Sequence, residues 1–174
     1  MMNILQILLF ILPAYVANST PVIFGGGLPV DFKMKFRGGG RILGDGKTWR
    51  GLLAGICFGS LTGLLEAQLC YSAVIPPSLC MNFIALGFAL STGTMLGDLA
   101  GSFIKRRMGI KRGHPSIILD QLSFLLFAML LSLPYMPDGL LAVDSIVILV
   151  ALTYLLHVLS NIVANRLGLK RVPW

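Results

Sequence analysis

Charged residues are scarce in this chain, and their scarcity excludes an ordinary soluble domain. Asp, Glu, Lys and Arg make up 12% of the 174 residues, whereas 56% of the residues are hydrophobic. A soluble domain usually carries about 25% charged residues. Cysteine is also rare, and Cys57, Cys70 and Cys80 show no CxxC spacing, so they give no indication of a zinc site. The composition therefore indicates an integral membrane protein.

Long apolar runs predict an all-α, polytopic membrane protein of one domain, residues 1–174. A bilayer core about 30 Å thick requires roughly 20 apolar residues per helix. By this rule we predict five transmembrane helices, at about residues 4–24, 51–71, 79–99, 116–133 and 140–163. No Lys or Arg precedes Lys33, so the first run lacks the positive start of a signal peptide. We interpret it as a retained helix, with cleavage after Ala17 as the alternative.

The few basic residues are unevenly placed, and their placement predicts the topology. They fall in three blocks, at residues 33–50, 105–112 and 166–171, whereas the connections at residues 67–80 and 133–145 contain no Lys or Arg. Positive loops mark the cytoplasmic side. We therefore expect the amino terminus outside, the carboxyl terminus in the cytoplasm, and cytoplasmic loops at residues 25–50 and 100–115. Because every block adjoins a predicted span, we expect no nucleic-acid partner.

Two of the cysteines, Cys70 and Cys80, lie in the first base-free connection. We expect both to remain unpaired in contact with lipid or the protein core. The alternative is a disulfide on the outer side.

The first basic loop is unusually rich in glycine, which permits close approach of the backbone to a ligand. Its segment Gly44-Asp45-Gly46-Lys47-Thr48 invites comparison with a phosphate-binding P-loop, but Arg41 stands where the opening glycine is required. Backbone amides and Lys47 can still hold phosphate by the same physics. A flexible linker is the alternative interpretation.

Two carboxylates flank the second basic block. On a helix, Asp98, Ser102, Lys105 and Arg106 share one face, at i, i+4, i+7 and i+8. Asp120 begins the next predicted span, so both carboxylates are expected just inside the cytoplasmic face. Ionisable residues that far into apolar segments are expensive and usually functional. Mg²⁺ is often held by one or two carboxylates together with substrate phosphates. Helix caps or ion pairs are the alternative roles.

These residues resemble a known signature. Gly97-Asp98-x-x-x-Ser102-x-x-Lys105-Arg106-x-x-Gly109-x-Lys111, followed by Asp120, is similar to that of CTP-dependent phosphatidate cytidylyltransferases. Gly46-Lys47-Thr48-Trp49-x-Gly51 resembles a second stretch of the same enzymes. The small size and the glycine-rich loop look most like the archaeal CDP-archaeol synthases. The chain departs from the bacterial signature at Arg112 and after Asp120, where acids that would carry a second metal are missing.

The resemblance implies a nucleotidyltransferase with Mg²⁺ as cofactor and CTP as substrate, in a cell membrane with the site at the cytoplasmic face. The acceptor would be a lipid phosphate, most simply 2,3-bis-O-geranylgeranylglycerol 1-phosphate. Asp98 and Asp120 would bind the metal. The remaining candidates are phosphate or nucleotide contacts: Lys105, Arg106, Lys111, Gly46, Lys47, Thr48 and Ser102, with Asp31 or Asp45 at the base or ribose. A CTP-dependent polyprenol kinase and a small ion or phosphate transporter are the alternatives. The oligomeric state stays open.

Overall fold

A computed structural model describes residues 2–37, 39–110, 114 and 116–169. Its five α-helices are α1 (Ile4–Phe24), α2 (Trp49–Tyr71), α3 (Phe83–Arg107), α4 (Ile117–Ser132) and α5 (Val143–Arg166). Short 3₁₀ turns stand at Pro77–Leu79 and Leu133–Tyr135. Within the described ranges there is no strand, only two isolated bridges between Pro29 and Thr48 and between Lys35 and Arg41. The all-α prediction is confirmed.

Four of the described helical segments are long and apolar enough to cross a membrane. They are Ile4–Phe24, Trp49–Tyr71, Pro77–Arg107 and Val143–Arg166. The predicted span at residues 116–133 corresponds to a shorter apolar helix, Leu119–Tyr135. Five helices therefore stand where five spans were predicted, although the fourth is shorter than the others.

The helix that contains most of the predicted third span extends beyond it. This helix begins at Phe83 and continues to Arg107, eight residues beyond the predicted end at Leu99. Lys105, Arg106 and Arg107 thus form its last turn, where cations are favoured by the negative end of the helix dipole. The expected loop at residues 100–115 is reduced to the segment between Arg107 and Ile117. The first basic loop matches its prediction closely, since α1 ends at Phe24 and α2 starts at Trp49.

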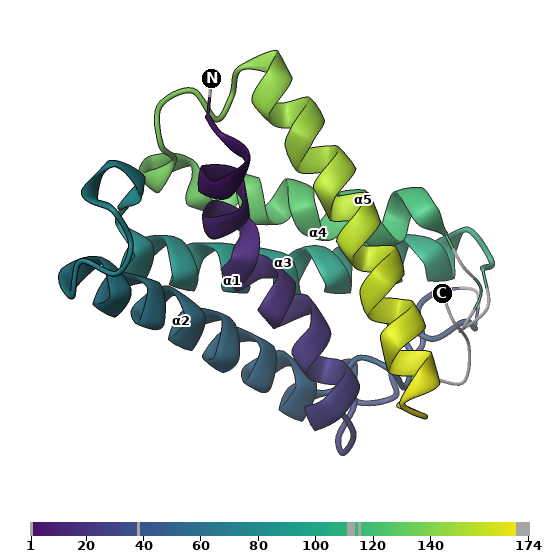
Figure 1. Ribbon diagram of the computed structural model, residues 1–174. Helices are drawn as coiled ribbons and strands as arrows, with labels where there is room; N and C mark the ends of the chain where they lie inside the picture. Colours follow the sequence, from purple (N-terminus) through teal and green to yellow (C-terminus); the bar gives the residue numbers. More distant parts are fainter. Residues whose placement is uncertain (1, 38, 111–113, 115, 170–174) are drawn as a thin grey trace.

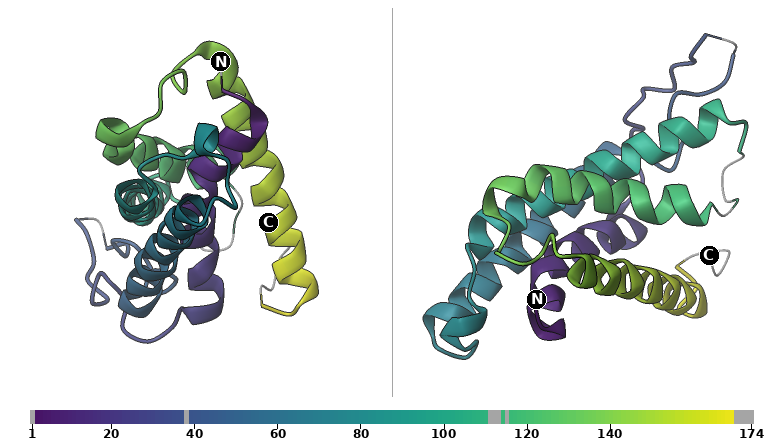
Figure 2. Two further views of the ribbon diagram at one scale, coloured as in Figure 1. Left: turned by 60° about the vertical axis from the view of Figure 1, so that its left-hand side comes forward. Right: turned by 90° about the horizontal axis from the view of Figure 1, so that it is seen from above.

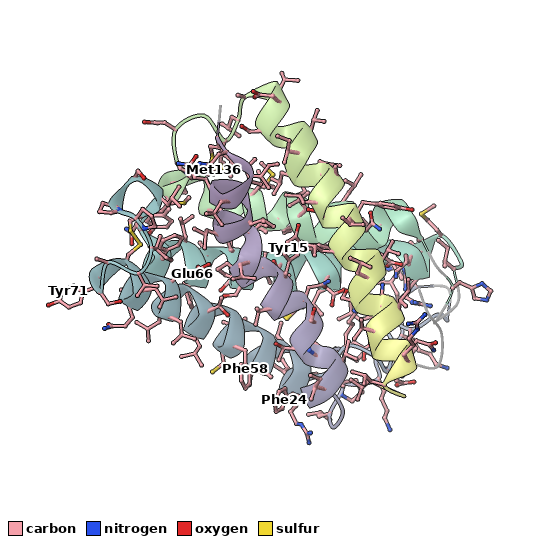
Figure 3. The ribbon with its side chains drawn as sticks, viewed as in Figure 1. Tyr15, Phe24, Phe58, Glu66, Tyr71 and Met136 are labelled. Atoms are coloured by element: carbon pink, nitrogen blue, oxygen red, sulfur yellow. A yellow bond between two sulfur atoms is a disulfide. The ribbon has the colours of Figure 1, made fainter. Side chains whose placement is uncertain are left out.

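The helices pack as a layer with two crossing members. In the layer, α3 lies between α2 and α4, and α1 packs over α2 and α3 (Figure 1). Close approach depends on glycine: a Cβ added to Gly63 of α2 would lie 2.7 Å from the Cα of Gly87 on α3. Small residues allow such contacts in membranes, where van der Waals packing is a main attraction between helices. Phe24 of α1 and Phe58 of α2 stack with ring centroids 4.9 Å apart (Figure 3).

The fifth helix is held mainly along α1. Tyr15 Oη and Thr153 Oγ1 are 2.9 Å apart, and the Met2 backbone N–H donates to Ser145 Oγ at 3.3 Å. Figure 2 shows α5 beside α1 and the layer, with its carboxyl end toward the same side as the loop after α1. The buried core under it includes Phe10, Phe124 and Leu149.

Cys70 and Cys80 form a disulfide with a Cα–Cα distance of 5.9 Å, so the expectation of unpaired thiols was wrong. The bond joins the end of α2 to the turn before α3, at the end of the bundle opposite the glycine-rich loop. Cys80 follows Cys70 by ten residues, and the turn at Pro76 between them brings the two segments of the chain back together. Cys57 is free and exposed.

Candidate nucleotide and metal site

Most of the predicted site residues lie at one end of the bundle. The carboxyl end of α1, the amino end of α2, the carboxyl end of α3 and the amino end of α4 meet there, and the loop between α1 and α2 lies against them (Figures 1 and 2). The helix order produces this arrangement, because antiparallel neighbours place alternate termini at the same end. Segments about 50 and 70 residues apart in sequence are thereby brought together.

The glycine-rich loop and α3 are joined by an ion pair. Lys47 Nζ lies 2.7 Å from Asp98 Oδ1 and 2.6 Å from Asp98 Oδ2. Both side chains are about one-quarter exposed. Together with Pro21 and Gly46 they line a small cavity of about 30 Å³, large enough for a water molecule. The two residues were both predicted for the site, and they are in direct contact.

The second carboxylate is paired in the same way. Lys105 Nζ donates to Asp120 Oδ1, and the backbone N–H of Ser116 donates to Asp120 Oδ2 at 3.1 Å. Asp120 stands in the first turn of α4, where a negative charge is favoured by the helix dipole. Each predicted metal ligand therefore has an ammonium partner from a different element of the chain, rather than the neighbouring Arg considered from sequence.

The expected polar face of α3 is formed by a continuous helix from Asp98 through Arg106. Ser102 is buried in the packing of the bundle, at 4% exposed. Arg106 turns back on its own helix end, donating from Nη1 to the carbonyl of Ile110 at 2.6 Å. Lys111, expected to hold phosphate, lies outside the described residues, as does Arg112.

Asp31 organises the loop internally. Arg41 donates to both its oxygens, at 2.7 and 3.2 Å, and the backbone N–H groups of Leu43 and Gly44 donate to Oδ2 at 3.0 and 3.1 Å. Burial by itself raises the pKa of Asp31, but these hydrogen bonds outweigh it and hold the pKa well below its usual range. The Asp31 side chain is 0% exposed, so it supports the loop rather than facing a ligand.

The remaining loop candidates differ in their surroundings. Asp45 is exposed and accepts a hydrogen bond from Arg41 Nη1 at 2.7 Å. Thr48 is the N-cap of α2, and its hydroxyl oxygen accepts from the Gly51 N–H at 3.2 Å. Thr48 thus fixes the start of α2, and Lys47 is the loop residue immediately before this cap. A Ser or Thr at this position is a standard helix N-cap.

Sequence reasoning missed the role of Arg107. Its Nη2 donates to the backbone carbonyl of Arg41 at 2.6 Å, and its guanidinium lies 4.4 Å from the ring centroid of Phe36 and 5.2 Å from that of Phe103. Phe103 is four residues earlier on α3, a helical spacing visible in the sequence. The contact with a loop 66 residues away was not visible.

The described residues contain no group of three or more His, Cys, Asp or Glu side chains arranged to hold a metal ion. A hard cation at this end would consequently take at most two carboxylates from those residues, with the other oxygen ligands from water or substrate. This is the mode in which proteins commonly bind Mg²⁺.

The chain matches known proteins along its whole length. The model of the CarS-like family, described as CDP-archaeol synthase, matches residues 1–174. A CDP-archaeol synthase of Pyrococcus horikoshii is 44% identical, covering 100% of this chain and 99% of that protein. One from Archaeoglobus fulgidus is 46% identical, covering 98% of each chain.

A solved structure, described as an intramembrane enzyme for archaeal membrane lipids biosynthesis, superposes with a TM-score of 0.75 at 42% sequence identity. The match covers 92% of this chain and 95% of the other. The resemblance inferred from Gly97–Asp120 and from the Gly46–Gly51 stretch thus extends to the complete sequence and to its fold. The chain belongs to the CarS-like family of CDP-archaeol synthases.

Proposed function

We propose that this chain transfers CMP from CTP to the phosphate of an archaeal ether lipid, 2,3-bis-O-geranylgeranylglycerol 1-phosphate, giving CDP-lipid and pyrophosphate. Membership of the family over the whole chain supports this reaction. The observation that supports a site here is the presence of two Lys–Asp pairs at the end of the bundle that carries the glycine-rich loop. Residues 1–174 form a single catalytic domain in the membrane.

The reaction requires no nucleophile from the protein. An oxygen of the lipid phosphate forms a bond to the α-phosphorus of CTP, and the bond from that phosphorus to the oxygen bridging the β-phosphorus breaks. Pyrophosphate leaves with the bridging oxygen. In such phosphoryl transfers the protein contributes positioning and neutralisation of charge. The cations at this end of the bundle fit that requirement.

Asp98 and Asp120 fit a hard cation, because each carboxylate already directs oxygen atoms at a compact positive group. We assign Mg²⁺ to these two side chains, with phosphate oxygens completing its ligands. When bound, Mg²⁺ supplies neutralisation of the charge on the phosphates. The missing acids after Asp120 favour a single metal held by the protein.

Lys47 and Lys105 then have two alternative partners each, a carboxylate or a phosphate. With Mg²⁺ held by Asp98, the Lys47 ammonium would be available to the phosphates of CTP. Lys105 would likewise be available to phosphate with Asp120 on the metal. Arg106 and Lys111 add positive charge near these pairs. Gly46 and Thr48 determine the backbone conformation on either side of Lys47. Ser102 lies on the same face of α3 as Asp98, and Asp45 is available to contact the ribose or the base.

A lipid acceptor is supported by an apolar cavity of about 420 Å³ beside the second ion pair. It is lined by residues of α3, α4 and α5, among them Ile104, which adjoins Lys105, and Leu119, which adjoins Asp120. A lipid chain in this cavity would leave its phosphate close to the Lys105–Asp120 pair. We propose that this end faces the cytoplasm of the cell, in keeping with its basic loops.

Radiolabelled CTP tests the reaction directly. Purified protein is supplied with Mg²⁺, the lipid phosphate and CTP labelled at either the α- or the γ-phosphate. Cytidylyl transfer places the α-label in the lipid fraction and releases the γ-label as pyrophosphate. Appearance of γ-label in lipid would identify a kinase, and no label in lipid would refute the transferase and favour a transporter.

A further inference from the structure

Three consecutive cations at the end of α3 have three different partners. Lys105 pairs with Asp120 on α4, and Arg106 donates to the Ile110 carbonyl at the end of its own helix. Arg107 donates a hydrogen bond to the loop between α1 and α2, whereas Arg106 only approaches that loop, with its Nε 3.9 Å from the position of a Cβ on Gly44. Sequence alone would treat the three as one basic cluster for phosphate, but their contacts separate them.

Arg107 is held on several sides. Its Nη2–H donates to the carbonyl of Arg41 at 2.6 Å, and its guanidinium lies over Phe36 and near Phe103. The two rings meet edge to face, with centroids 5.8 Å apart. A guanidinium stacks on aromatic faces through its planar, delocalised charge, which an ammonium does not reproduce. The arrangement ties the end of α3 to the loop through one cation and two rings.

The contacted part of the loop is a small hairpin. Phe36 N–H donates to Gly40 O at 2.8 Å, and Ile42 N–H donates to Met34 O at 3.2 Å. The Arg41 residue that accepts from Arg107 uses its own side chain to hold Asp31, which in turn accepts from the Gly44 N–H. Gly44 O accepts from Lys47 N–H at 3.3 Å. A continuous chain of contacts therefore leads from Arg107 to the backbone of Lys47.

We propose that Arg107 is a positioning residue that latches the glycine-rich loop to α3, so that Lys47 is held over the nucleotide site. The proposal rests on the proposed function for its substrate, CTP. Lys47 must exchange Asp98 for phosphate, so its own ion pair cannot fix the loop throughout the reaction. The Arg107 latch involves neither Asp98 nor Asp120, and it keeps the loop in place while that exchange occurs.

The alternative role for Arg107 is a direct contact with a phosphate of CTP. The two roles predict different responses to conservative substitutions. For the latch, Arg107→Lys retains the positive charge but loses the stacking, and Phe36→Leu loses a ring without altering charge. Both variants should raise the KM for CTP about tenfold with kcat little changed, the order expected from losing one charge-assisted hydrogen bond with its cation–π contacts. Phe103→Leu removes the other aromatic ring beside Arg107, on α3, and is a second test of the same contact.

Hydrogen exchange gives a readout independent of turnover. Arg107→Lys and Phe36→Leu should speed backbone exchange in residues 25–48 and leave α2 and α3 unchanged. Arg37→Met is the matched control, because it removes an exposed cation from the same loop outside the latch. It should leave both exchange and the KM for CTP at wild-type values.

A double-mutant cycle completes the test. If the latch is correct, the combined Arg107→Met, Phe36→Leu variant has a KM for CTP close to that of Arg107→Met alone, because both changes break one unit. Near-wild-type KM and loop exchange in Phe36→Leu, with a large loss only in Arg107→Met, would overturn the latch in favour of direct phosphate contact. If wild-type protein transfers no α-label, the proposed function fails, while loop exchange still decides the latch.

Discussion

Lys47 and Asp98, 51 residues apart in sequence, form an ion pair in which one ammonium contacts both carboxylate oxygens, at 2.7 and 2.6 Å. The same carboxylate is the first candidate ligand for Mg²⁺. With Mg²⁺ at Asp98, as proposed, the ammonium and the divalent cation would compete for this carboxylate, and nucleotide and metal binding would be coupled through one side chain.

This coupling predicts two effects of Lys47→Ala that point in opposite directions. Loss of a charge-assisted contact to phosphate should weaken CTP binding about ten- to hundredfold, from roughly 1.5–3 kcal/mol per contact. Loss of the competing ammonium should strengthen Mn²⁺ binding measured without CTP. Calorimetry with CTP and electron paramagnetic resonance with Mn²⁺ measure the two quantities. Unchanged CTP affinity would indicate that the loop is only a flexible linker. Weaker Mn²⁺ binding would contradict the proposed competition between Lys47 and the metal for Asp98.

The disulfide provides a test of topology. Disulfides form and persist in oxidising surroundings, which agrees with an outer position for the connection between α2 and α3. In a Cys57→Ser background, a membrane-impermeant maleimide should label Cys70 and Cys80 in intact cells only after reduction. A cysteine introduced at Lys35 should label only in permeabilised cells. Labelling of that position from outside would reverse the orientation and remove the site from the cytoplasmic face.

Asp31 predicts a pH dependence of the loop. Its carboxylate is buried and hydrogen-bonded in the fold, so its pKa is lowered from the ordinary value of about 3.9. A lowered pKa means that the contribution to loop stability is fully present above about pH 3.9 and is lost as pH falls toward the depressed value. Loop hydrogen exchange should therefore retain its protection at pH 4. Asp31→Asn should lose that protection at neutral pH, and equal protection in the variant would contradict the role.

The sequence predicted most of the helices and the end of the bundle at which the charged candidates lie, for identifiable reasons. Apolar runs set the bounds of α1, and alternating basic blocks placed Lys47, Asp98 and Asp120 at one end of the bundle. The apolar run did not indicate the end of α3, because Lys105 to Arg107 close that run yet stabilise a helix terminus. The Arg41–Asp31 and Arg107–Arg41 contacts were not predicted, because neither periodicity nor charge patterning encodes how a glycine-rich loop folds on itself.

The carboxylate pair gives the sharpest prediction. Asp98→Asn and Asp120→Asn keep side-chain shape but remove a charged oxygen ligand, so each should lose nearly all turnover while remaining folded in the membrane. Residues acting as one unit are non-additive, so the double variant should be little worse than either single one. Higher Mg²⁺, or Mn²⁺ in its place, should partly restore one single variant, since both ions suit oxygen ligands.

The competing explanation is that the two acids only neutralise Lys47 and Lys105, as their ion pairs permit. In that case replacement should lower expression and thermal stability, with activity per folded molecule largely retained. Lys105→Met combined with Asp120→Asn separates the two roles, because removing both charges restores neutrality without restoring a metal ligand. Turnover per folded molecule is measured against Mg²⁺ concentration for each variant, with Mn²⁺ binding as the readout independent of activity. Recovery of turnover in that double variant, or a normal metal requirement in Asp120→Asn, would remove Asp120 from the metal site.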